Sequence, residues 1–133
     1  MAQATFKSQR RLRCLRGNAT LAEVKAGKVI LRGEPGRTIT VHDGWLRSLG
    51  GSAGTATTVD ISDTADTPVV CFKMARGGLT ENTVARVGVA THYTGTTVGT
   101  PLTPGKGLRI DDAGGTLDTT VSIDYCIFYT VES

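Results

Sequence analysis

The most regular alternation of apolar and polar residues lies near the C-terminal end of the chain. From residue 117 to residue 131, every odd position except Thr119 is apolar, whereas the even positions up to residue 124 are Asp, Thr or Ser. Successive side chains of a strand point to opposite faces, so this pattern predicts one long β-strand with an apolar inner face. Cys126 and Phe128 make the far end of the strand apolar on both faces. We therefore expect another sheet, the N-terminal residues or a neighbouring subunit to cover that end.

Shorter alternating or apolar segments, separated by turn residues, fill the chain from residue 28 onward. They predict strands over residues 29–31, 37–45, 57–62, 69–74, 82–93, 97–102 and 107–111. Strands at a spacing of roughly 8–12 residues with glycine-rich turns are typical of an antiparallel sandwich. The sequence therefore predicts an all-β fold, an antiparallel β-sandwich with a jelly-roll-like arrangement, and a small barrel is the alternative. Helices do not alternate with strands, which excludes a nucleotide-binding α/β fold.

One short helix is predicted just before the first of these strands. Thr20 and Glu23 have the spacing of a capping box, in which each side chain hydrogen-bonds the backbone N–H of the other residue. Gly27 has the backbone freedom that is needed where a helix ends. These residues predict one or two helical turns and not a helical domain.

Basic residues are concentrated at the N-terminal end of the chain. Residues 1–32 contain eight Lys or Arg and one acidic residue, a net charge of +7, whereas residues 33–133 contain seven basic and eleven acidic residues, a net charge of −4, which together give the +3 of the whole chain. Concentrated like charge opposes compaction unless a partner neutralises it. We therefore divide the chain into a basic, extended N-terminal arm, residues 1–19, and a β-sandwich domain, residues 20–133.

No arrangement of residues in the sequence points to catalysis. Residues 50–54 match the spacing G-x-S-x-G, but the Thr-rich sequence after them favours extended structure, whereas a nucleophile elbow turns into a helix. His42 and His92 are the two histidines, and nothing in the sequence pairs either of them with a nucleophile or a carboxylate. We expect no enzyme activity, no catalytic residue and no cofactor.

The cysteines and the apolar segments bear on the cellular compartment. Cys14, Cys71 and Cys126 are isolated from one another and from histidine, so they fit neither a disulfide framework nor a zinc site. We expect Cys71 and Cys126 to be small core residues in a reducing compartment. No apolar run approaches the roughly 20 residues needed to cross a bilayer, and no secretory signal is recognisable. These features predict a protein that is assembled in the cytoplasm and has no membrane partner.

Three acidic residues form the one candidate cation site. Asp60, Asp63 and Asp66 follow one another at intervals of three across a predicted turn. They lack the loop pattern of a known calcium motif, and the same residues suit a tight Asx turn. We expect no bound metal, although the sequence alone leaves cation binding by these residues open.

Several segments follow one another in an order that resembles a known protein family. The segments include LAEVKAGKVIL at residues 21–31, PGRTITV at 35–41, LRSLGG at 46–51, TTVDISD at 57–63, GKGL at 105–108 and TVSIDY at 120–125. They resemble the small head decoration, or cement, proteins of tailed bacteriophages, over about residues 20–131. The resemblance implies a β-sandwich virion protein that binds the outer face of the assembled capsid, commonly as a homotrimer, and stabilises adjacent subunits of the major capsid protein.

The basic arm is the predicted docking element. An acidic shell attracts its charge, and the many repeated copies of a capsid turn weak contacts into stable attachment. The residues predicted to contact the capsid are Arg10, Arg11, Leu12, Arg13, Leu15 and Arg16. The arm contains Phe6 but no further aromatic residue for base stacking, so we expect a protein rather than a nucleic acid as its partner.

Two other functions remain open on the sequence. A tail or fibre component would bind host carbohydrate through exposed aromatic residues, for which the candidates are Trp45, Tyr93, Tyr125 and Tyr129. The alternation of the final strand assigns the last two to its apolar face. A virion protein that binds nucleic acid would use the basic arm, with a steep dependence on salt.

Overall fold

The computed structural model describes residues 11–52, 58–75, 78–89, 93–95, 97–113 and 120–133. Strands make up most of these residues. The elements are β1 (Arg13–Thr20), α2 (Leu21–Ala26), β2 (Lys28–Leu31), β3 (Thr38–Leu49), β4 (Thr58–Asp63), β5 (Val70–Ala75), β6 (Val84–Arg86), β7 (Tyr93–Gly95), β8 (Leu108–Ala113) and β9 (Ser122–Glu132). The expected all-β fold is confirmed. Within these residues, no helix has the length and apolar character required to cross a bilayer.

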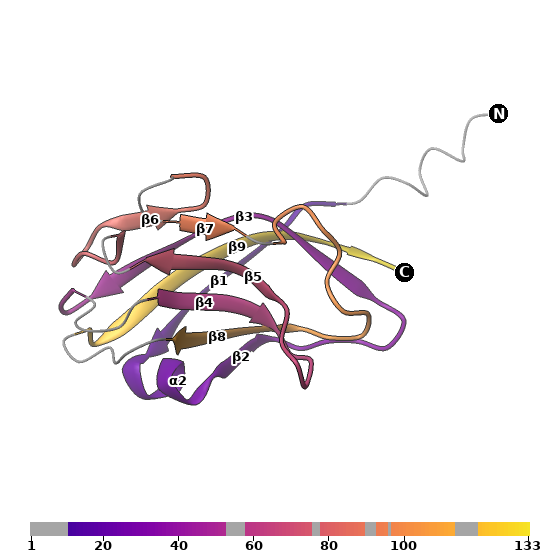
Figure 1. Cartoon of the computed structure of the whole chain (residues 1–133), viewed down its shortest axis with the longest axis horizontal. Coiled ribbons are helices and arrows are strands. Elements are labelled where there is room, and N and C mark those ends of the chain that lie inside the picture. Colours follow the sequence, from indigo (N-terminus) through magenta and orange to yellow (C-terminus); the bar gives the residue numbers. More distant parts are fainter. Residues whose placement is uncertain (1–10, 53–57, 76–77, 90–92, 96, 114–119) are drawn as a thin grey trace.

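The strands form two antiparallel sheets in a sandwich-like arrangement (Figure 1). One sheet has the order β1–β9–β3–β6, and the other has the order β2–β8–β4–β5–β7. Both sheets contribute to one hydrophobic core, which includes Ile127 of β9, Ile61 of β4 and Phe72 of β5. β1 and β2 are edge strands, and each pairs on one side only within the described residues.

β9 is a central strand of the first sheet, as the alternation near the C-terminus predicts. It pairs with β1 on one side and with β3 on the other. The inner positions of the pattern, Ile123, Tyr125, Ile127 and Tyr129, are buried. Cys126, on the other face, is 3% exposed, and Cys14 of β1 lies beside it. The sequence left three possible covers for the far end of this strand. Of these, the N-terminal residues contribute, because β1 lies beside it.

Val121 differs from the prediction. The alternation places it on the inner face of the strand, but its side chain is 62% exposed. Residue 121 precedes β9; its N–H donates to the carbonyl oxygen of Leu49, and its own carbonyl oxygen accepts the N–H of Leu21. These bonds hold it as a link between β3 and α2, outside the core. Positions 117 and 119 of the same pattern lie outside the described residues.

The predicted capping box is present and starts α2. The Thr20 hydroxyl accepts the N–H of Glu23 at 3.3 Å, and the Glu23 carboxylate accepts the N–H of Thr20 at 2.9 Å. Gly27 ends the helix with φ of 78°, a left-handed conformation that favours glycine. The helix buries Val24 and connects β1 in one sheet to β2 in the other.

The predicted strand over residues 82–93 is much shorter than expected. β6 comprises only Val84–Arg86, and β7 begins at Tyr93. The chain turns directly after β6, because the N–H of Val89 donates to the carbonyl oxygen of Arg86 at 3.2 Å. Val89 is accordingly 40% exposed rather than part of an apolar face. Residues 90–92 lie outside the described part of the chain.

The predicted strand over residues 97–102 is a turn followed by one isolated antiparallel bridge, between Pro101 and Thr40 of β3. The N–H of Thr100 donates to the carbonyl oxygen of Thr97 at 3.0 Å, which closes the turn. Leu102 is 4% exposed and belongs to the hydrophobic core without being part of a strand. The apolar residues of this segment therefore belong to a loop that is anchored in the core, and not to a regular strand.

Candidate protein-binding surface

β1 carries the N-terminal basic residues along an edge of the first sheet. Leu15 is half-buried and packs against the core. Gly17 lies on the same side, where a Cβ would overlap the ring of Tyr125. Arg16 lies on the opposite, exposed side of the strand. The alternation of β1 thus separates a side that packs onto the core from a side that faces solvent.

The predicted docking residues other than Leu15 are exposed where the structure describes them. Arg10 lies outside the described residues. Arg11 and Leu12 precede β1 and are exposed, Leu12 to 57%. Arg13 and Arg16 are exposed on β1 itself. The structure therefore places these residues just before β1 and along its first half, with Arg13 on the side of Leu15 and Arg16 on the opposite side.

The structure places residues 13–19 of the predicted arm in the first sheet. β1 pairs with β9 along its whole length. Leu15, Gly17 and Ala19 alternate on its inner side, and Ala19 is fully buried. The basic and polar residues between them hide this period of two in the sequence. Alternation of small and apolar residues was the signal that could have identified the strand.

Polar and aromatic side chains join the outer side of β1 to β9 and β3. The Arg16 guanidinium lies 5.9 Å from the ring centre of Trp45, within cation–π range. The Asn18 amide donates to Oδ1 of Asp124 at 2.8 Å, and Arg47 donates to Oδ2 at 2.7 Å. The bond from Asn18, followed by the contacts with Arg47, lowers the pKa of Asp124. An ionised Asp124 therefore fixes the neighbouring side chains of three strands.

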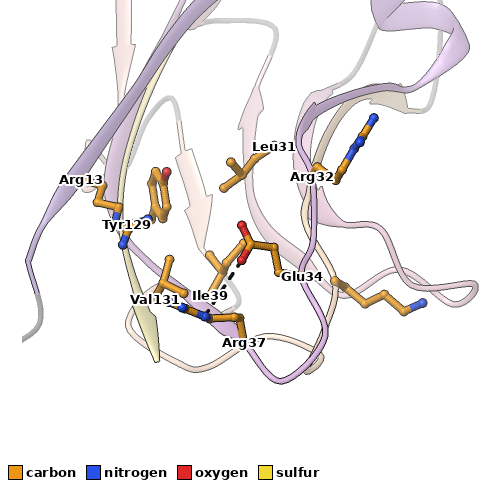
Figure 2. Close-up of a pocket in the computed structure, with 9 residues that line it drawn as sticks. Arg13, Leu31, Arg32, Glu34, Arg37, Ile39, Tyr129 and Val131 are labelled. Carbon is orange, nitrogen blue, oxygen red and sulfur yellow. Dashed lines mark ion pairs between the residues drawn. The ribbon is translucent and has the colours of Figure 1, made fainter. Parts of the chain in front are cut away.

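A cleft of about 230 Å³ opens beside the start of β1 (Figure 2). Figure 2 shows Arg13 and Tyr129 on one side of the cleft and Leu31 of β2 on the other. Val131 and Ile39 also line it, so part of its surface is apolar. Because β1 and β2 are the edges of their sheets, the cleft lies where both sheets end.

Charged side chains surround the opening of this cleft. Its lining contains four Arg or Lys residues and one acidic residue, Glu34. Oε2 of Glu34 lies 4.0 Å from Nε of Arg37. Both side chains are exposed, so water weakens the attraction between their charges. The side chain of Arg32 points away from Leu31 (Figure 2). Arg13, Arg37 and the apolar residues together can accept a small group that has an anionic part and an apolar part.

Close backbone approach positions the loop that carries these charges. A Cβ at Gly107 would overlap the carbonyl oxygen of Leu31, and a Cβ at Gly33 would overlap that of Gly105. The N–H of Gly105 donates to the carbonyl oxygen of Arg37 at 2.7 Å. Sequence reasoning missed the cleft because it depends on this contact between loops that are far apart along the chain.

The residues considered for catalysis have separate partners. The Ser52 hydroxyl accepts the N–H of Glu81 at 2.9 Å. Nε2 of His42 lies 2.8 Å from the hydroxyl oxygen of Thr130. His92 and the last two residues of the G-x-S-x-G segment lie outside the described residues. These contacts are those of loop and surface residues.

Asp63 is a buried anchor for two loops. Its Oδ1 accepts the N–H groups of Val69 at 2.9 Å and Ala65 at 3.2 Å. Its Oδ2 accepts the hydroxyl of Thr103 at 2.6 Å and the N–H of the same residue at 3.3 Å. Among the residues that the structure describes, no group of three or more His, Cys, Asp or Glu is arranged to hold a metal ion.

The aromatic candidates for sugar binding are largely covered. Tyr125 and Tyr129 are 6% and 8% exposed, which confirms their expected place on the apolar face of β9. Trp45 and Tyr93 are half-buried, and Arg16 lies over the ring of Trp45.

Comparisons of the chain with models of protein families, with curated proteins and with solved structures find no match. The edge strand β1, its exposed cations and the neighbouring cleft are therefore the features from which a function is inferred.

Proposed function

We propose that this protein is a non-enzymatic structural component of a tailed-bacteriophage virion. It binds the outside of the assembled capsid and stabilises adjacent subunits of the major capsid protein. The observation that supports this most directly is the position of β1 at the edge of its sheet. β1 carries the exposed residues Arg13 and Arg16, and among the described residues no strand pairs with its outer edge. Such a surface suits attachment to another protein.

Three physical properties of this edge favour protein docking. The unpaired backbone groups of an edge strand can hydrogen-bond an extended segment of a partner. The exposed cations Arg11, Arg13 and Arg16 attract an acidic surface. Leu12, which is 57% exposed, adds apolar contact area. On a capsid the same contact is repeated many times, so weak individual contacts produce stable attachment.

The cleft beside β1 fits the same role. Its apolar residues and the cations Arg13 and Arg37 suit an acidic segment that also carries an apolar side chain. The same proposal includes three further features. They are a homotrimer at the junction of neighbouring capsid subunits, a jelly-roll-like connectivity and a basic arm at residues 1–12. The protein would be part of the virion after assembly in the host cytoplasm.

Reversing two charges on β1 is expected to weaken binding to the capsid. Arg13→Glu with Arg16→Glu should reduce affinity about tenfold or more, which corresponds to about 1.4 kcal/mol or more. The physical reason is repulsion between the new carboxylates and the acidic surface of the shell. Cosedimentation with purified capsids of the phage that encodes this chain, at physiological salt, measures the affinity.

Lys25→Glu with Arg86→Glu is the matched control. Both residues are exposed and lie on α2 and β6, and the double variant changes the net charge by the same amount. It should bind as the unmodified protein does. Equal loss of affinity in both variants would show that overall charge, and not β1, determines binding. Failure of the unmodified protein to bind capsids would contradict the proposed function itself.

A further inference from the structure

Two thiols lie next to each other on the outer side of the first sheet. Cys14 on β1 and Cys126 on β9 are separated by 3.3 Å between their Sγ atoms. Cys14 is exposed, whereas Cys126 is 3% exposed. The third cysteine, Cys71, is fully buried on β5 in the other sheet. Cys14 and Cys126 therefore form a pair with one thiol that is open to small molecules in solution.

The strand register allows a bond between the two sulfurs after a small movement. Cys14 lies opposite Phe128 and Cys126 lies opposite Arg16, so the cysteines are diagonal neighbours. Diagonal Cα atoms lie roughly 7–8 Å apart, just beyond the range of about 4.4–6.8 Å that a disulfide usually spans, so the backbone must move for the bond to form. A bond of about 2.05 Å requires the sulfurs to approach by roughly 1.3 Å. β1 is an edge strand that pairs only with β9 among the described residues, so it can shift relative to β9 without displacing a third strand.

We infer that Cys14 and Cys126 are a site of covalent modification by small-molecule disulfides, which link them as an intramolecular disulfide. The Cys14 thiolate attacks one sulfur of oxidised glutathione, forms a mixed disulfide and releases one glutathione thiolate. The Cys126 thiolate then attacks Sγ of Cys14 and releases the second. The two protein thiols are oxidised to one disulfide, and their protons end on two molecules of reduced glutathione.

The environments of the two thiols define this order of attack. Burial, together with the neighbouring Cys14, raises the pKa of Cys126 to about 11, so its thiolate is scarce at neutral pH. Exposed Cys14 is the residue that an oxidant can reach first. Cys126 resolves the mixed disulfide because its sulfur already lies within 3.3 Å. The second step should accelerate as the pH rises.

The bond would fasten β1 to β9 and so fix the proposed docking edge. This chemistry does not depend on capsid binding, and only its timing rests on the proposed function. A virion that leaves the reducing cytoplasm meets oxidising conditions in which disulfides persist. The docking edge would then be locked covalently after release.

Treatment of the reduced, full-length protein with oxidised glutathione at pH 8 tests the inference. Intact mass and peptide mapping should show a monomer that has lost two hydrogens, retains no glutathione and links Cys14 to Cys126. One thiol, that of Cys71, should remain after denaturation. Trypsin cleavage after Arg16 should slow about tenfold, because the bond reduces opening of β1, and reduction should restore the rate.

Two variants separate the roles of the cysteines. Cys126→Ser should keep glutathione bound to Cys14 as a stable adduct, because the resolving thiol is absent. Cys71→Ser should form the same intramolecular bond as the unmodified protein. A lasting glutathione adduct on the unmodified protein, a covalent dimer through Cys14, or unchanged thiols would each overturn the inference.

Discussion

Replacing Phe72 with alanine is expected to lower the free energy of unfolding by about 3–5 kcal/mol. Phe72 on β5 is fully buried. Its ring meets β3 of the opposite sheet, where a Cβ at Gly44 would lie 3.3 Å from its Cζ atom, and its centre lies 6.2 Å from that of Tyr93. Removal of the ring leaves a cavity between two hydrogen-bonded sheets, which cannot collapse freely. Unfolding in guanidinium chloride measures the loss as a lower midpoint.

Val84→Ala is the control for this substitution. Val84 lies on the short strand β6 and is 42% exposed, so its truncation should cost less than about 1 kcal/mol. A similar loss in both variants would contradict the assignment of Phe72 to the centre of the core.

Replacing Asp63 with alanine is expected to cost about 3 kcal/mol or more. The substitution removes the acceptor of four hydrogen bonds, two of them from Thr103 and one each from Val69 and Ala65. Asp63 is fully buried, so its loss leaves donors without an acceptor near the core. Asp66→Ala, at an exposed position in the same turn, should change stability little. Equal effects of the two substitutions would contradict the anchoring role.

The same carboxylate should make stability dependent on pH. Burial would raise the pKa of Asp63, but the hydrogen bonds from Thr103, Val69 and Ala65 outweigh it and bring the pKa below its usual 3.8. A group with a lowered folded-state pKa stabilises the fold above its unfolded pKa and loses this effect as the pH falls through the folded value. The advantage of the unmodified protein over Asp63→Asn should therefore shrink below about pH 4. An advantage that grows on acidification would contradict the bonding of Asp63.

The elements that local rules define were predictable from the sequence. β9 follows an alternation that both neighbouring strands, β1 and β3, reinforce by pairing with it. The capping residues Thr20 and Glu23 define α2 within a few positions of the chain. Cys71 lies in the hydrophobic core, as expected, whereas Cys126 is buried on the other face of the sheet beside Cys14.

The features that depend on distant contacts were not predictable. Leu102 has the apolar character of a strand residue, but its N–H donates to the carbonyl oxygen of Ile39, far away along the chain, and it lies in a core-anchored loop. The cleft requires the approach of Gly33 to Gly107 and of β1 to β2, which no local pattern encodes. The 3.3 Å contact between Cys14 and Cys126 likewise depends on the register of β1 against β9.

The position of this protein in a cryo-electron microscopy reconstruction of the phage particle tests the central claim most directly. The proposal predicts density for the two-sheet body on the outside of the head, at junctions between capsid subunits. The edge strand β1, with Arg13 and Arg16, should face an acidic segment of the shell. Density inside the head or on the tail, or a body attached with β1 facing solvent, would contradict the proposal.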